Sequence, residues 1–390
     1  MKQLFFILFV ALIIFSGCNK YIAAIETAEC DKAETGITGY SKAANMEKIM
    51  DEFTKKGIPG VVMAVKSEEG YWATAKGYAK IETKTPMALC HLQYLQSISK
   101  TYMAVAILKL YEQGKINLDD PMTKYLPEKY HHYILDGDKM TVRMLLSHTS
   151  GVPEYNFSPA YVSYLLQSPA HTFEPEDYLR YVKNKKLRFT PGSNYTYTNT
   201  NYVLLALIGD ALTGNHAQFI AENIFRPLKL DNTYYRDDKS YPQYENLVNS
   251  YWDRHSDGIV ENVSTLQRNN VACLAGDDGI VTTPEDAVTF LKALADGRLL
   301  SDSTMRQMKT WVKNKDGHPA YGLGLVYREI NGIAGYGHSG GGIGAGCELY
   351  YFPEKNLCYF IAINLGTVTE SPLHKDIEKL LAQLHIELLK

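Results

Sequence analysis

A serine and a lysine three residues apart, Ser97 and Lys100, stand where a helix should begin. The run from Thr101 to Tyr111 has apolar residues at the spacing of one helical face, and Gly114 follows as a stop signal. A serine at the start of that helix lies at the positive end of the helix dipole, and the lysine returns to the same face one turn on. Because burial lowers the pKa of a lysine, its neutral amine can take the proton of the hydroxyl and activate it. An N-cap serine beside an unrelated surface lysine is the alternative, since this spacing alone is common.

A tyrosine and an asparagine, Tyr197 and Asn199, precede a second apolar run at 202–207. From a loop before a helix, both side chains can point into one cleft. A lysine close by favours the ionised form of a phenol, and an amide can orient both lysine and substrate. The alternative is a polar loop with a buried tyrosine.

Glycines surround His338 and Ser339 in the stretch 337–342, ahead of a predicted strand at 347–352. Glycine lets backbone N–H groups approach a ligand closely, as an oxyanion site requires, and the histidine and serine add side-chain donors. A flexible turn between strands is the alternative.

The elements that must position these residues follow a clear order along the chain. The patterns predict a helix after Ser41, strands at 61–65 and 71–78, helices and loops from Ser97 to about 275, strands at 321–330, 347–352 and 358–365, and a last helix from Ser371. This order predicts an α+β fold in which an antiparallel sheet is flanked by terminal helices, with a mainly helical subdomain at about 100–275 inserted.

The composition is that of a globular protein with a large core. Its 390 residues are 45% hydrophobic and 21% charged, which predicts one large domain or two. A formal net charge of -3 provides no basic surface for nucleic acid, so nucleic acid is not an expected partner.

The N-terminus predicts export. Residues 1–18 combine Lys2 with an apolar run too short to span a bilayer, as in a secretory signal. Residues 15–18 resemble a bacterial lipobox, which would make Cys18 a lipidated N-terminus followed by a tether at 19–40; Phe15 departs from the usual leucine, so plain cleavage nearby stays open. The mature chain would then be a lipoprotein of the bacterial cell envelope, in the periplasm or on the surface, held to the membrane through Cys18.

The remaining cysteines show no pairing pattern. Cys18 aside, they are Cys30, Cys90, Cys273, Cys347 and Cys358. Their odd number and the lack of a C-x-x-C spacing predict neither a zinc site nor a disulfide framework.

Three motifs in order carry a resemblance to a known family. They are Ser97-x-x-Lys100, Tyr197-x-Asn199 and His338-Ser339-Gly340. This set resembles the serine β-lactamase and penicillin-binding protein superfamily, in the branch of class C β-lactamases, D-alanyl-D-alanine carboxypeptidases and related esterases. The stretches at 145–151, 279–286 and 321–324 look like the same family, and the resemblance covers about residues 41–390. It implies the β-lactamase/transpeptidase-like fold and a serine hydrolase without cofactor or metal.

The resemblance also implies roles for individual residues. Ser97 would be the nucleophile that forms an acyl-enzyme, with Lys100 and Tyr197 sharing proton transfer. Asn199 would orient substrate and lysine, and the backbone N–H groups of Ser97 and Gly341 would form the oxyanion hole.

The third motif departs from the family pattern. His338, Ser339 and Gly340 would bind the far end of the substrate, a carboxylate, yet class C β-lactamases usually have lysine and threonine at the first two positions. A histidine is only partly charged near neutral pH, which argues against a β-lactamase role and looks more like some D-alanyl-D-alanine and D-amino-acid peptidases. His148, in one of the family-like stretches, is interpreted as structural.

The function expected is hydrolysis of a small amide or ester through an acyl-enzyme in the cell envelope. The first expectation is an activity like that of a D-alanyl-D-alanine carboxypeptidase or peptidase, or a β-lactamase-related one, on a substrate such as a peptidoglycan-derived peptide. A carboxylesterase of the same fold and a penicillin-binding sensor without turnover are the alternatives. A third is the nucleophile elbow of α/β-hydrolases, since Gly337–Gly341 fits G-x-S-x-G with Ser339 as nucleophile and Asp376 and His385 downstream. The glycine-rich stretch that follows is a poor helix, which the elbow requires.

Overall fold

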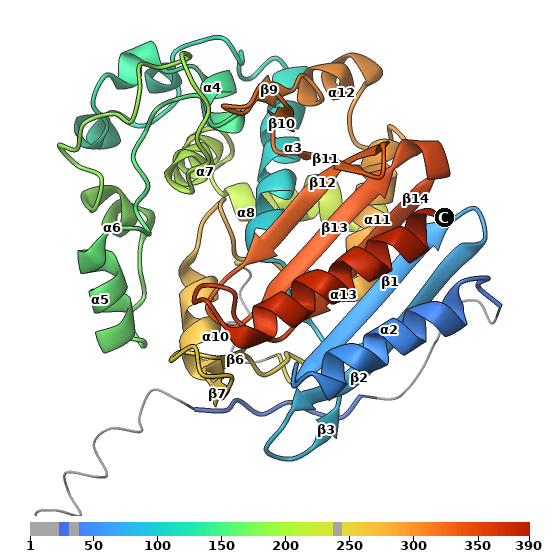
Figure 1. Ribbon diagram of the computed structural model, residues 1–390. Coiled ribbons are helices and arrows are strands. Elements are labelled where there is room, and N and C mark those ends of the chain that lie inside the picture. The colour runs from blue at the N-terminus through green and yellow to red at the C-terminus, as the bar shows by residue number, and fades with distance from the viewer. Residues whose placement is uncertain (1–22, 31–38, 237–243) are drawn as a thin grey trace, which may run out of the picture.

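The computed structural model describes residues 23–30, 39–236 and 244–390. A nine-stranded antiparallel sheet forms its centre, in the order β3-β2-β1-β14-β13-β12-β11-β10-β9 (Figure 1). Its strands are β1 (Gly60–Ser67), β2 (Gly70–Lys80), β3 (Thr85–Pro86), β9 (Val312–Lys313), β10 (Pro319–Tyr321), β11 (Val326–Ile330), β12 (Ile333–Gly341), β13 (Gly346–Phe352) and β14 (Leu357–Ile363). The predicted antiparallel sheet and α+β class are confirmed.

The two terminal helices, α2 (Ala43–Lys55) and α13 (Pro372–Leu389), lie together on one face of this sheet (Figure 1). Alternation along β1 divides the core: Val61 packs with α2 and α13, whereas Val62 belongs to the cluster on the opposite face. Ser371 caps α13 as predicted, its side chain accepting a hydrogen bond from the Leu373 N–H at 3.2 Å. Ser41 does not cap α2, because its hydroxyl donates to Glu69 instead.

Helices make up most of the chain beyond the other face of the sheet (Figure 1). They are α3 (Ser99–Glu112), α4 (Val142–Leu146), α5 (Pro159–Gln167), α6 (Pro175–Arg180), α7 (Thr200–Thr213), α8 (His216–Ile220), α9 (Arg226–Leu228), α10 (Ser264–Cys273), α11 (Pro284–Ala295) and α12 (Asp302–Met308). Short strands interrupt them: β4 (Gln93–Tyr94), β5 (Thr233–Tyr234), β6 (Tyr251–Trp252), β7 (Glu261–Asn262) and β8 (Val281–Thr282). The helix predicted at 101–111 is α3. Helix α11 packs on that other face, against β1, β13 and β14, whereas α5 and α6 lie away from it (Figure 1).

The sheet differs from the prediction in two places. The strand expected at 321–330 is two strands, β10 and β11, because the chain turns at 322–325 with Gly324 at φ +82°. The glycine-rich stretch 337–342, for which a flexible turn between strands is the alternative, lies mostly in β12. Glycines lower strand propensity, but here they let the neighbouring chain approach closely.

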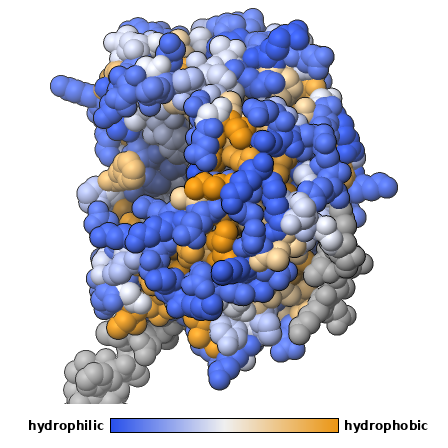
Figure 2. Space-filling model, turned by 45° about the vertical axis from the view of Figure 1, so that its right-hand side comes forward, coloured by the Kyte–Doolittle hydropathy of each residue, from blue (hydrophilic) through white to orange (hydrophobic). Residues whose placement is uncertain are grey.

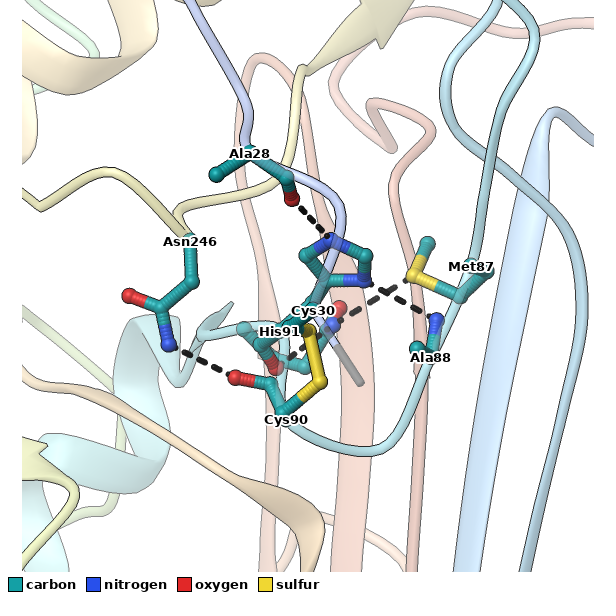
Figure 3. The surroundings of a disulfide bond; sticks show 8 residues. Ala28, Cys30, Met87, Ala88, Cys90, His91 and Asn246 are labelled. Atoms are coloured by element: carbon teal, nitrogen blue, oxygen red, sulfur yellow. Dashed lines mark hydrogen bonds between the residues drawn. A yellow bond between two sulfur atoms is a disulfide. The ribbon is translucent and has the colours of Figure 1, made fainter. Parts of the chain in front are cut away.

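The N-terminal segment 23–30 packs against the folded domain. The side chain of Asn249 both donates to the Ile25 carbonyl and accepts from the Ile25 N–H, each at 3.1 Å. A disulfide joins Cys30 to Cys90, so the prediction of no disulfide was wrong (Figure 3). Cysteine spacing cannot reveal a pair 60 residues apart when Cys273, Cys347 and Cys358 are buried and free.

A histidine beside the disulfide reinforces this attachment (Figure 3). His91 accepts a hydrogen bond at Nδ1 from the Ala88 N–H (2.9 Å), so its other nitrogen donates to the Ala28 carbonyl (3.0 Å). Burial lowers the pKa of His91, which favours this neutral form. The predicted signal at 1–18, with Cys18, and much of the predicted tether lie outside the described residues.

The face of the molecule seen in Figure 2 is largely hydrophilic. Polar side chains predominate on it, and hydrophobic ones gather in small patches. Among the helices of the described ranges, none has both the length and the apolar character needed to cross a bilayer.

Candidate active site

Ser97 and Lys100 meet at the start of α3. Ser97 lies in the one-turn helix η1 (Gln96–Ile98), which runs directly into α3, and Lys100 follows in the first turn. The Lys100 ammonium lies 3.0 Å from the Ser97 hydroxyl and donates to the Asp277 backbone carbonyl at 2.6 Å. Lys100 is fully buried, and this burial lowers its pKa, against the opposing effect of nearby carboxyl groups. A lysine in this position can take a proton from the serine.

Close packing against β12 holds the turn that carries Ser97. A Cβ atom on Gly340 would lie 2.5 Å from the Leu95 carbonyl oxygen and 2.7 Å from the Gln96 Cβ, so only glycine allows this approach. Gln96 itself has φ +47°, a strained conformation for a residue with a side chain. The strain lies directly before the serine, where it sets the direction of the turn.

Tyr197 and Asn199 enter the same site from the loop before α7. The Tyr197 ring centre lies 5.1 Å from the Lys100 nitrogen, and the Asn199 N–H donates to Glu154 at 2.6 Å. The Tyr197 hydroxyl is buried without a hydrogen-bond partner of normal geometry in the described part of the chain. Burial raises its pKa well above 10, and the nearby Ser97 hydroxyl only partly offsets this. The expectation that the Tyr197 phenol is ionised was therefore wrong. The effect of burial on its pKa outweighs the effect of the nearby lysine, and Tyr197 stays protonated.

Two buried histidines stand behind this tyrosine. The ring centre of His148 lies 4.4 Å from that of Tyr197, so a residue interpreted as structural packs directly against the site. His338 accepts from the Tyr321 hydroxyl at Nε2 (3.0 Å), while Nδ1 lies 2.6 Å from the Ser339 carbonyl. Burial, followed by the charge of Lys100, lowers the pKa of His338 to about 3. The expectation that His338 is partly charged near neutral pH was wrong.

Ser339 points away from this site. It lies opposite Glu348 in the pairing of β12 with β13, and the Glu348 carboxylate is hydrogen-bonded to His385 of α13 at 2.8 Å. Ser339 lines a separate cavity of about 290 Å³ together with Phe53 and Ile377, on the face covered by the terminal helices. Because adjacent residues of a strand face opposite sides, the predicted joint contact of His338 and Ser339 with substrate is not present.

The α/β-hydrolase alternative is excluded by the same geometry. Ser339 lies within an antiparallel strand that turns into β13, and no helix follows it. Asp376 and His385 both lie on α13, and the His385 imidazole is engaged by Glu348 and Tyr359.

A cavity of about 440 Å³ opens beside Ser97. Asn199, Gly341 and Gln96 line it, as do two acidic residues that the motifs did not single out, Asp277 and Asp278. Burial raises the pKa of Asp277 to about 6 and that of Asp278 to about 7. Two aspartates before a glycine are unremarkable in sequence, and only the fold reveals that they line the same cavity as Ser97.

The described residues contain no group of three or more histidine, cysteine or acidic side chains arranged to hold a metal ion. The groups brought together around Ser97 are its hydroxyl, the buried amine of Lys100 and the protonated phenol of Tyr197.

Comparison with known proteins agrees with this constellation. The family model described as Beta-lactamase matches residues 43–384. The chain belongs to the β-lactamase family. It is 28% identical to Penicillin-binding protein 4* of Bacillus subtilis, over 84% of this chain and 73% of that protein. It is 26% identical to the human mitochondrial serine beta-lactamase-like protein LACTB, over 80% of this chain and 71% of that protein.

Comparison with solved structures supports the same fold. A D-stereospecific amidohydrolase from Streptomyces superposes with a TM-score of 0.74 at 28% identity, covering 86% of this chain and 97% of that one. The predicted β-lactamase/transpeptidase-like fold is therefore confirmed, and the chain is a β-lactamase-family serine hydrolase.

Proposed function

We propose that this β-lactamase-family hydrolase cleaves small amides of the peptide or amino-acid type through an acyl-enzyme on Ser97. The observation that carries the proposal is the contact between the fully buried Lys100 amine and the Ser97 hydroxyl, 3.0 Å apart at the wall of the cavity. A nucleophile beside a base within hydrogen-bond reach is the arrangement that acyl transfer requires.

The proposed steps use groups already placed around the cavity. The Ser97 oxygen attacks the amide carbon while its proton passes to neutral Lys100, and the backbone N–H groups of Ser97 and Gly341 stabilise the oxyanion. The protonated Tyr197 phenol then donates a proton to the leaving nitrogen and regains one from Lys100. Asn199 orients the substrate, and water releases the acyl group by the reverse proton path.

The neutral state of His338 favours an amide substrate whose leaving group carries no carboxylate. A β-lactam or a D-alanyl-D-alanine peptide presents a carboxylate, and the cavity lining holds no lysine or arginine among the described residues to pair with it. The 28% identity to a D-stereospecific amidohydrolase supports amides of D-amino acids as the first candidates.

We also propose that the protein acts in the cell envelope, exported and anchored through Cys18. The disulfide between Cys30 and Cys90 supports this location, because disulfides persist in oxidising compartments outside the cytoplasm.

The test compares four substrates on the purified full chain and on its Ser97→Ala variant. They are a D-amino-acid p-nitroanilide, a D-alanyl-D-alanine peptide, p-nitrophenyl acetate and a chromogenic cephalosporin. We expect turnover of the anilide at a kcat/KM above those of the peptide and the cephalosporin, lost in Ser97→Ala. Turnover of the ester alone would instead identify a carboxylesterase, and a stable cephalosporin adduct without turnover would identify a sensor.

A further inference from the structure

Unsatisfied acceptors line the cavity close to the nucleophile. Asp277 is 2% exposed, and its Oδ1 has no hydrogen-bond partner within the described ranges; its other oxygen accepts from the Tyr155 hydroxyl at 2.7 Å. The Oδ1 of Asn156 is likewise buried and unpaired there. Asp278 accepts a hydrogen bond from the Gly279 N–H at 2.7 Å, and no side chain of the described residues donates to it. Buried acceptors without donors are costly, so the unpaired oxygens of Asp277 and Asn156, with Asp278 beside them in the cavity lining, point to a ligand that supplies N–H donors.

The charge of the cavity selects the kind of donor. Asp277 and Asp278 line it, and among its described lining residues there is no lysine, arginine or histidine. The nearest basic side chain is Lys100, whose nitrogen contacts the Ser97 hydroxyl and the Asp277 backbone oxygen rather than either carboxylate. A primary ammonium offers one positive charge and three donors, which matches two carboxylates and one amide oxygen.

The location suits a group attached next to the reacting carbonyl. The side-chain nitrogen of Lys100 contacts both the Ser97 hydroxyl and the backbone carbonyl of Asp277. The backbone that carries the two aspartates therefore lies within one hydrogen bond of the catalytic amine. The α-ammonium of an amino-acid amide is one carbon removed from the carbonyl that Ser97 attacks. The cavity also presents Phe157 and Val368, which are 77% and 54% exposed, as an apolar rim for the neighbouring side chain.

We propose that Asp278, Asp277 and Asn156 bind the free ammonium of the acyl donor, so that the enzyme cleaves amino-acid amides with an unblocked amino group and discriminates against N-acylated ones. The inference rests on the proposed function, which makes Ser97 the acylated residue. Burial keeps the pKa of Asp278 at about 7, and a bound ammonium favours its charged form.

The experiment measures kcat/KM of the full chain for D- and L-phenylalanine p-nitroanilide and for their N-acetyl derivatives. We expect the free amine of the better enantiomer to exceed its acetylated form by about 100-fold, the size expected for a charge-assisted contact. Asp278→Asn should reduce this ratio by at least about 10-fold. Asp302→Asn, which removes the same charge from the exposed start of α12, should keep the wild-type ratio.

A measurement on the wild type alone gives a second test. Phenylalaninol, which has an ammonium and no carboxylate, should slow labelling of Ser97 by a fluorophosphonate, and 3-phenyl-1-propanol should not. Equal hydrolysis of free and acetylated substrates, an unchanged ratio in Asp278→Asn, or labelled Ser97 with neither anilide cleaved would overturn the inference while leaving the acyl-enzyme intact. Absence of any Ser97 adduct would instead show that the proposed function itself fails.

Discussion

Replacing Gly340 by alanine perturbs the contact that holds the Ser97 turn against β12. The added Cβ would meet the Leu95 carbonyl oxygen at 2.5 Å and the Cys347 sulfur at 2.8 Å. A carbon and a carbonyl oxygen normally stay about 3.3 Å apart at closest, so the strand and the turn must separate by about 0.8 Å. That movement changes the distance between the Ser97 and Gly341 N–H groups, which we assign to the oxyanion hole.

The expected loss is large in activity and moderate in stability. A misplacement of about 1 Å can reduce the rate by about 100-fold, so the acylation rate with a fluorophosphonate should fall by about that factor. Overpacking should lower the free energy of unfolding by about 1–3 kcal/mol, measured by urea denaturation.

Gly335→Ala is the matched control on the same strand. Its Cβ would meet the Phe352 ring at 2.7 Å, on the opposite face of the sheet and away from Ser97. It should cost similar stability and keep most of the acylation rate. If Gly340→Ala acylates as fast as the wild type, or if both variants lose activity equally, the reasoning about the turn is refuted.

Three further predictions follow from the environment of single groups. The double variant Cys30→Ser with Cys90→Ser should have a free energy of unfolding about 2–4 kcal/mol lower than the wild type, measured by denaturation, while a fluorophosphonate still labels Ser97. A double variant as stable as the wild type would contradict the docking of residues 23–30. Because the pKa of His338 is about 3, His338→Gln should leave the pH dependence of kcat/KM unchanged between about pH 5 and 8, where a free histidine titrates. If this variant loses an inflection near pH 6.5 that the wild type shows, His338 is not neutral in that range. The pKa of Asp278 is raised to about 7 in the folded protein from about 3.9 in the unfolded chain, so this residue lowers the free energy of unfolding increasingly as the pH rises from about 3.9 to about 7. The stability of Asp278→Asn relative to the wild type should therefore increase across that pH range. A stability difference that does not change with pH would argue against the buried charge.

Much of the fold could be predicted because local patterns agree with it. The Ser371-Pro372 start of α13 and the apolar stripe of α3 depend on neighbouring residues alone. The strand β12 could not be recognised, since its four glycines lack strand propensity and are needed for contacts with Leu95 and Phe352, which belong to other elements. Long-range approach of two backbones leaves no periodic signal.

The candidate site, too, could be predicted where nearby residues determine it and could not where the whole fold does. Ser97 and Lys100 are one helical turn apart, so their contact follows from helix geometry. The charge states of Tyr197 and His338 could not be predicted, because burial outweighs the neighbouring groups and burial is a property of the whole fold. Asp278 was missed for the same reason.

Intact mass of the full chain after reaction with a fluorophosphonate tests the central claim most directly. The account predicts one adduct per chain for the wild type and for Ser339→Ala, whose side chain faces α2 and α13, and none for Ser97→Ala. An adduct that persists in Ser97→Ala, or one that is lost in Ser339→Ala, would contradict the assignment of Ser97 as the nucleophile.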